Sequence, residues 1–155
     1  MDTKHIKTMK LNTAVDLFEK IKADTKDKSE VKTYKKFIDL LNDLLSKNLS
    51  EIQVQKIENK LDLLALDSFP DKKGKYFKKQ FANFKKFLSS EFSFITLNYY
   101  VAIGMSLGVC FGVAIGQSAF GNSSTGIAVG MAVGLAIGAN LDAKAKKEGR
   151  VLNVK

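Results

Sequence analysis

The hydrophobic positions divide the chain into an amphipathic N-terminal part and a long apolar stretch without charged residues. In the N-terminal part, apolar residues recur every three or four positions, which is the period of a helix with one buried face. The stretch from Phe92 to Leu141 contains no Asp, Glu, Lys or Arg. These patterns predict an all-α protein with a small helical bundle over residues 1–91, an apolar hairpin over 92–141 and a basic tail over 142–155.

Start and stop signals predict four helices in the bundle. The first covers Thr13–Ala23. The sequences "DKSE" at Asp27–Glu30 and "SEIQ" at Ser50–Gln53 have the spacing of a capping box, and we expect them to begin the second and third helices. The segment Ser68–Lys75 contains a proline and a glycine and therefore ends the third helix. A fourth helix follows it.

Each of the last three bundle helices carries one apolar stripe. The heptad spacing would also suit a coiled coil with a partner, but it lasts only two or three turns, so packing within the chain is favoured. The stripes consist of Val31, Tyr34, Ile38, Leu41 and Leu45; of Val54, Ile57, Leu61 and Leu64; and of Phe77, Phe81, Phe84, Leu88, Phe92 and Ile95.

The apolar stretch contains a repeat in two copies, Val101–Gly116 and Gly126–Leu141, in which large and small residues alternate. Strict alternation also permits a β-hairpin, but glycine weakens strands and the hairpin would have no polar face. In a helix, four residues advance the face by only about 40°, so residues at every fourth position form a stripe. One stripe of each predicted helix is glycine: Gly104, Gly108, Gly112 and Gly116, then Gly126, Gly130, Gly134 and Gly138. On the first helix, the opposite stripe is Ala102, Ser106, Cys110 and Ala114.

The repeated Gly-x-x-x-Gly spacing resembles the glycine-zipper membrane segments of bacterial proteins. The resemblance covers Tyr99–Leu141, and residues 1–91 resemble no family that we recognise. It implies that the eight glycines are helix-packing residues and that copies of the chain form homo-oligomers. Some glycine-zipper proteins form channels or permeabilise membranes. Small residues let helix backbones approach closely in lipid, which is consistent with this expectation.

The length and flanks of the apolar stretch predict two membrane spans, at about 97–118 and 124–141. Tyr99–Gly116 would be about 27 Å long as a helix, against a hydrocarbon core of about 30 Å. An uncharged turn, Gln117–Thr125, joins the spans. The net charge of +9 is spread over both flanks, because 20 Lys and 14 acidic residues precede the stretch and five basic and two acidic residues follow it. The positive-inside rule then places both termini in the cytoplasm, at a bacterial inner membrane.

Seven lysines around the start of the fourth helix have no acidic residue among them. Beside a bilayer they would contact anionic lipid headgroups, although an ordinary solvated helix face explains them equally well. Nucleic-acid binding is not favoured, because the aromatic residues between them follow the helical period and therefore face inward. The lysines are Lys72, Lys73, Lys75, Lys78, Lys79, Lys85 and Lys86.

No catalytic, cofactor or metal constellation is apparent, so we expect no enzyme and no cofactor. His5 has no Cys or carboxylate pattern near it, and Cys110 lies within a span, where packing is the simplest role. The leading hypothesis is a self-associating membrane protein, with a membrane-perturbing or pore-forming activity that its bundle regulates. The alternatives are a non-enzymatic membrane anchor for an unidentified partner protein, and a soluble all-α interaction protein.

Overall fold

The structure, a computed structural model, is all-α, as the sequence predicts. It describes residues 9–66 and 73–154, and for Lys73 and Phe120 only the backbone. Within these ranges there are six helices and one two-stranded sheet. The chain forms two compact units, residues 94–151 and the remainder.

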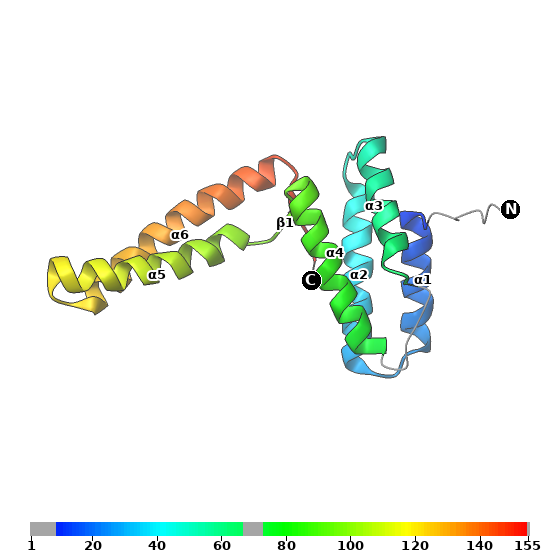
Figure 1. Cartoon of the computed structure of the whole chain (residues 1–155), viewed down its shortest axis with the longest axis horizontal. Coiled ribbons are helices and arrows are strands. Elements are labelled where there is room, and N and C mark those ends of the chain that lie inside the picture. The colour runs from blue at the N-terminus through cyan, green and yellow to red at the C-terminus, as the bar shows by residue number, and fades with distance from the viewer. Residues whose placement is uncertain (1–8, 67–72, 155) are drawn as a thin grey trace, which may run out of the picture. The chain divides into compact units, whose positions relative to one another are not determined.

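The first unit is a four-helix bundle of α1 (Leu11–Asp24), α2 (Lys28–Ser46), α3 (Glu51–Leu63) and α4 (Lys73–Phe92) (Figure 1). Its core is a cluster of aromatic rings from three helices. Phe18 stacks on Phe37 with 4.3 Å between ring centroids, and Phe77 meets Tyr34 edge-on at 5.2 Å. Each such pair adds about 0.5–1.5 kcal/mol to the stabilisation that burial itself provides.

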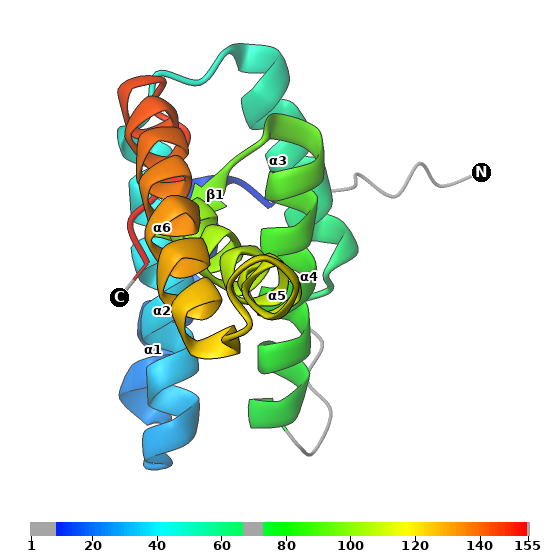
Figure 2. The same cartoon turned by 90° about the vertical axis from the view of Figure 1, so that its left-hand side faces the viewer.

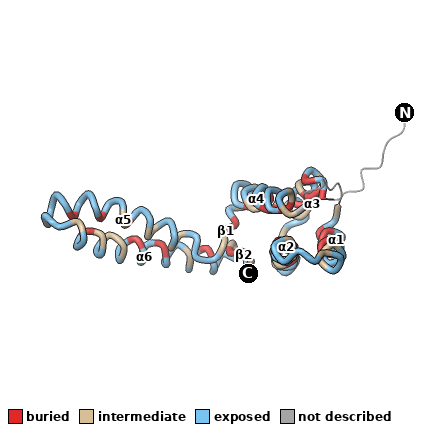
Figure 3. Tube along the Cα trace, turned by 90° about the horizontal axis from the view of Figure 1, so that it is seen from below, coloured by how far each residue is buried: buried red, intermediate tan, exposed pale blue. Residues whose placement is uncertain are grey.

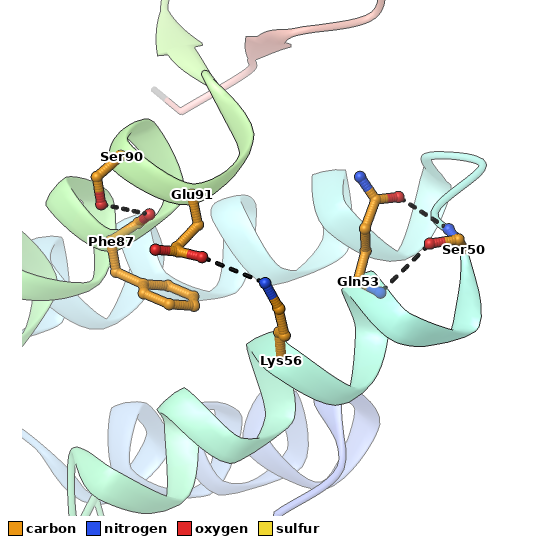
Figure 4. A network of polar contacts seen from close by, with 6 residues as sticks. All are labelled: Ser50, Gln53, Lys56, Phe87, Ser90 and Glu91. Atoms are coloured by element: carbon orange, nitrogen blue, oxygen red, sulfur yellow. Dashed lines mark hydrogen bonds and ion pairs between the residues drawn. The ribbon is translucent and has the colours of Figure 1, made fainter.

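The predicted capping box at the start of α3 is confirmed. The Gln53 N–H donates to the Ser50 hydroxyl at 3.3 Å, and the Ser50 N–H donates to the Gln53 side chain at 2.9 Å (Figure 4). An exposed ion pair between Lys56 and Glu91, 3.4 Å apart, joins α3 to α4 in the same view.

The capping box predicted at the start of α2 is only half right. Asp27 does accept from the N–H groups of Ser29 and Glu30. The Glu30 side chain, however, accepts from the Gly74 N–H at 2.8 Å and from the Tyr34 hydroxyl at 3.2 Å. Burial, reinforced by the Glu30 carboxylate, raises the pKa of Tyr34 to about 12, so its hydroxyl remains a donor. Glu30 thus ties α2 to the start of α4.

The buried face of α2 is wider than the single stripe that the sequence predicted. Phe37, Leu40 and Leu44 are buried as well, whereas the predicted core residue Leu45 is 43% exposed. The reason is that α2 packs against both α1 and α4, so residues on two adjoining sides of the helix are covered.

The stripe predicted for α4 ends earlier than expected. Phe77, Phe81, Phe84 and Leu88 are buried, but Ile95 is not helical. Backbone φ is positive at Ser93, which ends the helical path, and Ile95 lies in β1 (Ile95–Thr96).

The second unit is a hairpin of two helices, α5 (Tyr99–Phe120) and α6 (Ser123–Lys147), which lie side by side in both views (Figure 1, Figure 2). The β-hairpin alternative is therefore wrong. The connection is much shorter than the predicted turn, because only Gly121 and Asn122 are outside the helices. Gly121 has a φ of 60°, which glycine adopts without strain, and Asn122 caps α6 by accepting from the Ser124 N–H.

A small sheet and a helix cap close the other end of this hairpin. Helix α6 runs to Lys147, so residues 142–147, at the start of the predicted tail, are helical. It ends in a Schellman motif, in which Gly149 has a φ of 69° and the Arg150 N–H donates to the Ala145 carbonyl at 2.9 Å. The strand β2 (Val151–Leu152) then pairs with β1, and Val151 and Ala145 are buried beside Ile95.

The bundle core provides a matched pair of substitutions on one helix. Leu61 is fully buried and Leu63 is 79% exposed, two residues further along α3. We expect Leu61→Ala to lower the free energy of unfolding of the bundle by about 2–5 kcal/mol, and Leu63→Ala by about 0.5 kcal/mol or less. Urea unfolding of the full chain in mild detergent, followed by near-ultraviolet circular dichroism, measures both. Equal losses would contradict the described orientation of α3.

Candidate functional site

The contact between α5 and α6 is made by glycine backbones. A Cβ atom built at any of the eight repeat glycines would lie less than 3.0 Å from a backbone atom of the opposite helix or its cap. No side chain larger than hydrogen fits there unless the helices move apart. We call this contact the glycine interface. Its facing pairs are Gly104 with Gly134, Gly108 with Gly130, and Gly112 with Gly126, while Gly138 faces Tyr100 and Gly116 faces Gly126 and Asn122.

The nearest atom to most of these Cβ positions is a carbonyl oxygen. At Gly108, for example, it is the oxygen of Gly130, and at Gly130 it is the oxygen of Gly108. The glycine hydrogen that replaces the side chain therefore points at a carbonyl of the other helix. Such Cα–H···O contacts contribute roughly 0.5–1 kcal/mol each. A reciprocal set of them stabilises the hairpin without burying any large side chain.

The large apolar side chains of the hairpin point outward instead. Within residues 94–151, all of the buried residues of α6 are glycine or alanine: Gly126, Gly134, Gly138 and Ala145. Figure 3 shows how much of α5 and α6 is exposed. This arrangement is the inverse of a soluble helical hairpin, in which large residues are buried. The exposed large residues are Ile103, Leu107, Phe111, Val113, Ile115, Val129, Val133, Leu135, Ile137 and Leu141.

An apolar groove of about 390 Å³ runs along one side of the glycine interface. The glycines form its floor, and larger residues from both helices form its walls. Sequence reasoning did not predict this groove, because it depends on which large stripe of each helix lies beside the contact. The wall residues are Leu107, Phe111, Ile115, Val129, Val133 and Ile137.

The second small-residue stripe of each helix is exposed. On α5 the members Ala102, Ser106, Cys110 and Ala114 are all exposed, as are Ala128, Ala132 and Ala136 on α6. The Ser106 hydroxyl donates to the Ala102 carbonyl of its own helix, 2.9 Å away. We call these two sets the outer stripes. They leave the outer edges of the hairpin flat and free of bulky side chains.

The structure shows one helix-capping residue that the sequence did not reveal. Asp142 on α6 accepts from the N–H groups of Tyr100 at 3.1 Å and Val101 at 3.0 Å, through different carboxylate oxygens. It therefore caps the N-terminus of α5, where Asn98 makes no side-chain cap. Gly138 faces Tyr100, and Asp142 follows Gly138 by one turn, so the register of the glycines would have been the signal for this contact.

Five of the seven predicted lipid-contact lysines have described side chains, and all five lie on α4 in the bundle unit. Lys72 and the Lys73 side chain lie outside the described residues. Lys78 donates to the Ser29 hydroxyl at 3.0 Å, and Lys85 lies 5.0 Å from the centre of the Phe81 ring. The remaining three, Lys75, Lys79 and Lys86, are exposed on α4.

The described residues contain no group of His, Cys, Asp and Glu that could hold a metal ion. His5 lies outside them. Two segments, Tyr99–Ala119 and Ser123–Lys147, are long and apolar enough to cross a membrane. Only 11% and 17% of their most apolar windows are buried, which sets them apart from core helices of a soluble domain. No family model, curated protein or solved structure matches the chain.

The glycine interface predicts that the stability of the contact between α5 and α6 falls steeply as side-chain size increases. We expect Gly108→Ala to destabilise the contact between α5 and α6 by about 1–3 kcal/mol, because its methyl group meets the Gly130 carbonyl. Ser106→Thr adds one carbon on the exposed outer stripe and is the matched control. Leu97 and Asn140 are replaced by cysteine and labelled with a donor and an acceptor dye, in a chain that carries Cys110→Ala. Energy transfer between the dyes then reports the separation of the helices as SDS is added. Equal midpoints for the two variants would contradict the described contact.

Proposed function

We propose that the chain is an integral membrane protein whose hairpin inserts into lipid and holds the helical bundle at the membrane surface. The observation that carries this proposal is the inverted packing of the hairpin. Its small residues are buried against each other and its large apolar residues are exposed. In water these side chains would cost roughly 25 cal/mol per Å² of apolar surface, whereas in hydrocarbon the cost disappears.

The helix lengths suit a bilayer. At 1.5 Å per residue, the 22 residues of α5 reach about 33 Å and the 25 residues of α6 about 37 Å, against a hydrocarbon core of about 30 Å. Between its first and last turns, a helix hydrogen-bonds each backbone N–H and C=O internally, which lipid requires. The serine hydroxyls are satisfied in the same way, because Ser106 and Ser118 donate to carbonyls of their own helix.

The distribution of charge supports one orientation. The turn end of the hairpin, residues 117–125, is uncharged, whereas the last turn of α6 contains Lys144, Lys146 and Lys147. An uncharged turn crosses a membrane more readily than a basic segment, and cytoplasmic loops are enriched in Lys and Arg. We therefore propose that the turn is translocated and that both termini remain in the cytoplasm, as at a bacterial inner membrane.

Self-association through the same helices is the second element of the proposal. The glycine stripes are already in contact within one chain, so the outer stripes are the surfaces available to a second copy. The small side chains there allow close approach of helix backbones in lipid. Because each hairpin has one outer stripe on α5 and another on α6, head-to-tail contacts would build a row or a ring.

Anchoring is better supported than conduction. An ion pathway needs a continuous polar lining, and the hydroxyls of Ser106 and Ser118 are engaged within their own helix. The membrane-perturbing role, and the regulatory or partner-binding role of the bundle, stay predictions.

Membrane fractionation tests the proposal directly. We expect the full-length chain to remain in the membrane after a sodium carbonate wash, because the hairpin is held by lipid and not by surface charge. The control is a chain in which Phe92–Lys155 is deleted, which should be released into the supernatant. Release of the full-length chain would favour the soluble alternative and reject the proposed function.

The hairpin register predicts which residues meet between neighbouring copies. Gly108 is level with Gly130 and Gly112 with Gly126, so Cys110 is level with Ala128. In copies with the same orientation and depth, Cys110 of one copy should approach residue 128 of the next. We expect Ala128→Cys to form a ladder of disulfide-linked oligomers with the native Cys110 under mild oxidation.

The cross-linking experiment has two controls, the Val129→Cys variant and the unmodified chain. Val129→Cys places the thiol on a large-residue stripe, and we expect no ladder from it. The unmodified chain, with Cys110 alone, should remain monomeric on a non-reducing gel. A dimer from Cys110 alone would indicate α5-to-α5 contacts instead, and the absence of any cross-link in the Ala128→Cys chain would reject association through the outer stripes.

A further inference from the structure

We propose that the end of the hairpin opposite the turn binds the headgroups of anionic phospholipids. We call this region the open end and define it as Tyr99, Tyr100, Lys144, Lys146 and Lys147. The inference rests on the proposed function, because it names the lipid class that a membrane-inserted hairpin would select.

The open end brings two aromatic residues and the basic turn of α6 together. The hydrogen bonds from the Tyr100 and Val101 N–H groups to Asp142 fix the start of α5 beside the part of α6 that precedes its lysines. Tyr99 is 41% exposed, and its ring meets the Tyr100 ring edge-on at 5.2 Å. Tyrosine favours the headgroup level of a bilayer, because its ring is apolar and its hydroxyl is polar.

The acidic side chains of the open end are engaged elsewhere. Asp142 is committed to the α5 amides, and Glu148 pairs with Arg150. Lys144, Lys146 and Lys147 are exposed, and none of the ion pairs found among the described residues includes them. Gly138 faces Tyr100, and the three lysines follow Gly138 by six to nine residues. Three exposed positive charges therefore lie beyond the level of Tyr99 and Tyr100, on the side away from the turn.

The chemistry of these groups matches a phosphodiester surface. A lysine ammonium is a compact charge with three donors, suited to phosphate oxygens. Near an anionic leaflet each lysine contributes about 1 kcal/mol, which corresponds to about a fivefold preference. The uncharged turn at residues 117–125 offers no such attraction. The lipid preference should therefore arise at one end of the hairpin only.

The test uses the full chain in phosphatidylcholine vesicles that contain traces of spin-labelled lipid. Electron paramagnetic resonance measures the fraction of label that the protein immobilises. We expect labelled phosphatidylglycerol to be preferred over labelled phosphatidylcholine by about fivefold. The combined substitution Lys144→Gln, Lys146→Gln and Lys147→Gln should bring this ratio close to one.

A matched variant separates the open end from the basic surface of the bundle. Lys75→Gln, Lys79→Gln and Lys86→Gln remove the same charge from exposed positions on α4, and we expect the lipid preference to survive. If this variant loses the preference as strongly as the open-end variant does, or if the open-end variant keeps it, the inference is overturned.

The same vesicles distinguish failure of the inference from failure of the proposed function. Resistance of the wild-type chain to a carbonate wash, with equal immobilisation of both labels, would overturn the inference and leave membrane insertion intact. Release of the wild-type chain by carbonate would overturn both. Retention together with a preference that depends on the three open-end lysines would support both.

Discussion

The second unit of this chain depends on contact between two helix backbones without intervening side chains. The contact requires a residue with no Cβ at each of eight positions, spaced by four along both helices. The exposure of the large apolar residues follows from that spacing. The large residues cannot enter the contact, so they are exposed. The groove forms because glycines line its base and larger residues of both helices line its sides.

The two units follow opposite packing rules. In the bundle, aromatic and aliphatic side chains fill the space between helices, and the resulting core is typical of a domain that folds in water. In the hairpin, the apolar side chains face the surroundings and the close approach of backbones replaces a side-chain core. One chain thus contains a bundle packed like a domain in water and a hairpin whose large apolar side chains face its surroundings, and the proposal of a membrane-tethered bundle rests on this difference.

Patterns among neighbouring residues predicted the helices well, whereas the contacts that the sequence analysis missed join residues far apart in the chain. The helical class, the Ser50 capping box and the glycine stripes could be read from spacing, because each depends on residues within a few positions of one another. The second partner of Glu30 is Gly74, which lies 44 positions away, and the tie from Asp142 to Tyr100 spans 42. Such contacts depend on how the helices pack against one another, which spacing along the sequence does not show. The turn was overestimated because polar residues around Gly121 look like a loop but continue both helices.

The two-residue connection between α5 and α6 also limits how the helices can slide. A slip of one, two or three residues would bring larger side chains against the opposing carbonyls, so only a shift of a whole glycine period would restore the fit. That shift is about 6 Å along the helix axis. Gly121 and Asn122 alone are too short a connection to allow this shift, so α5 and α6 pack in one register.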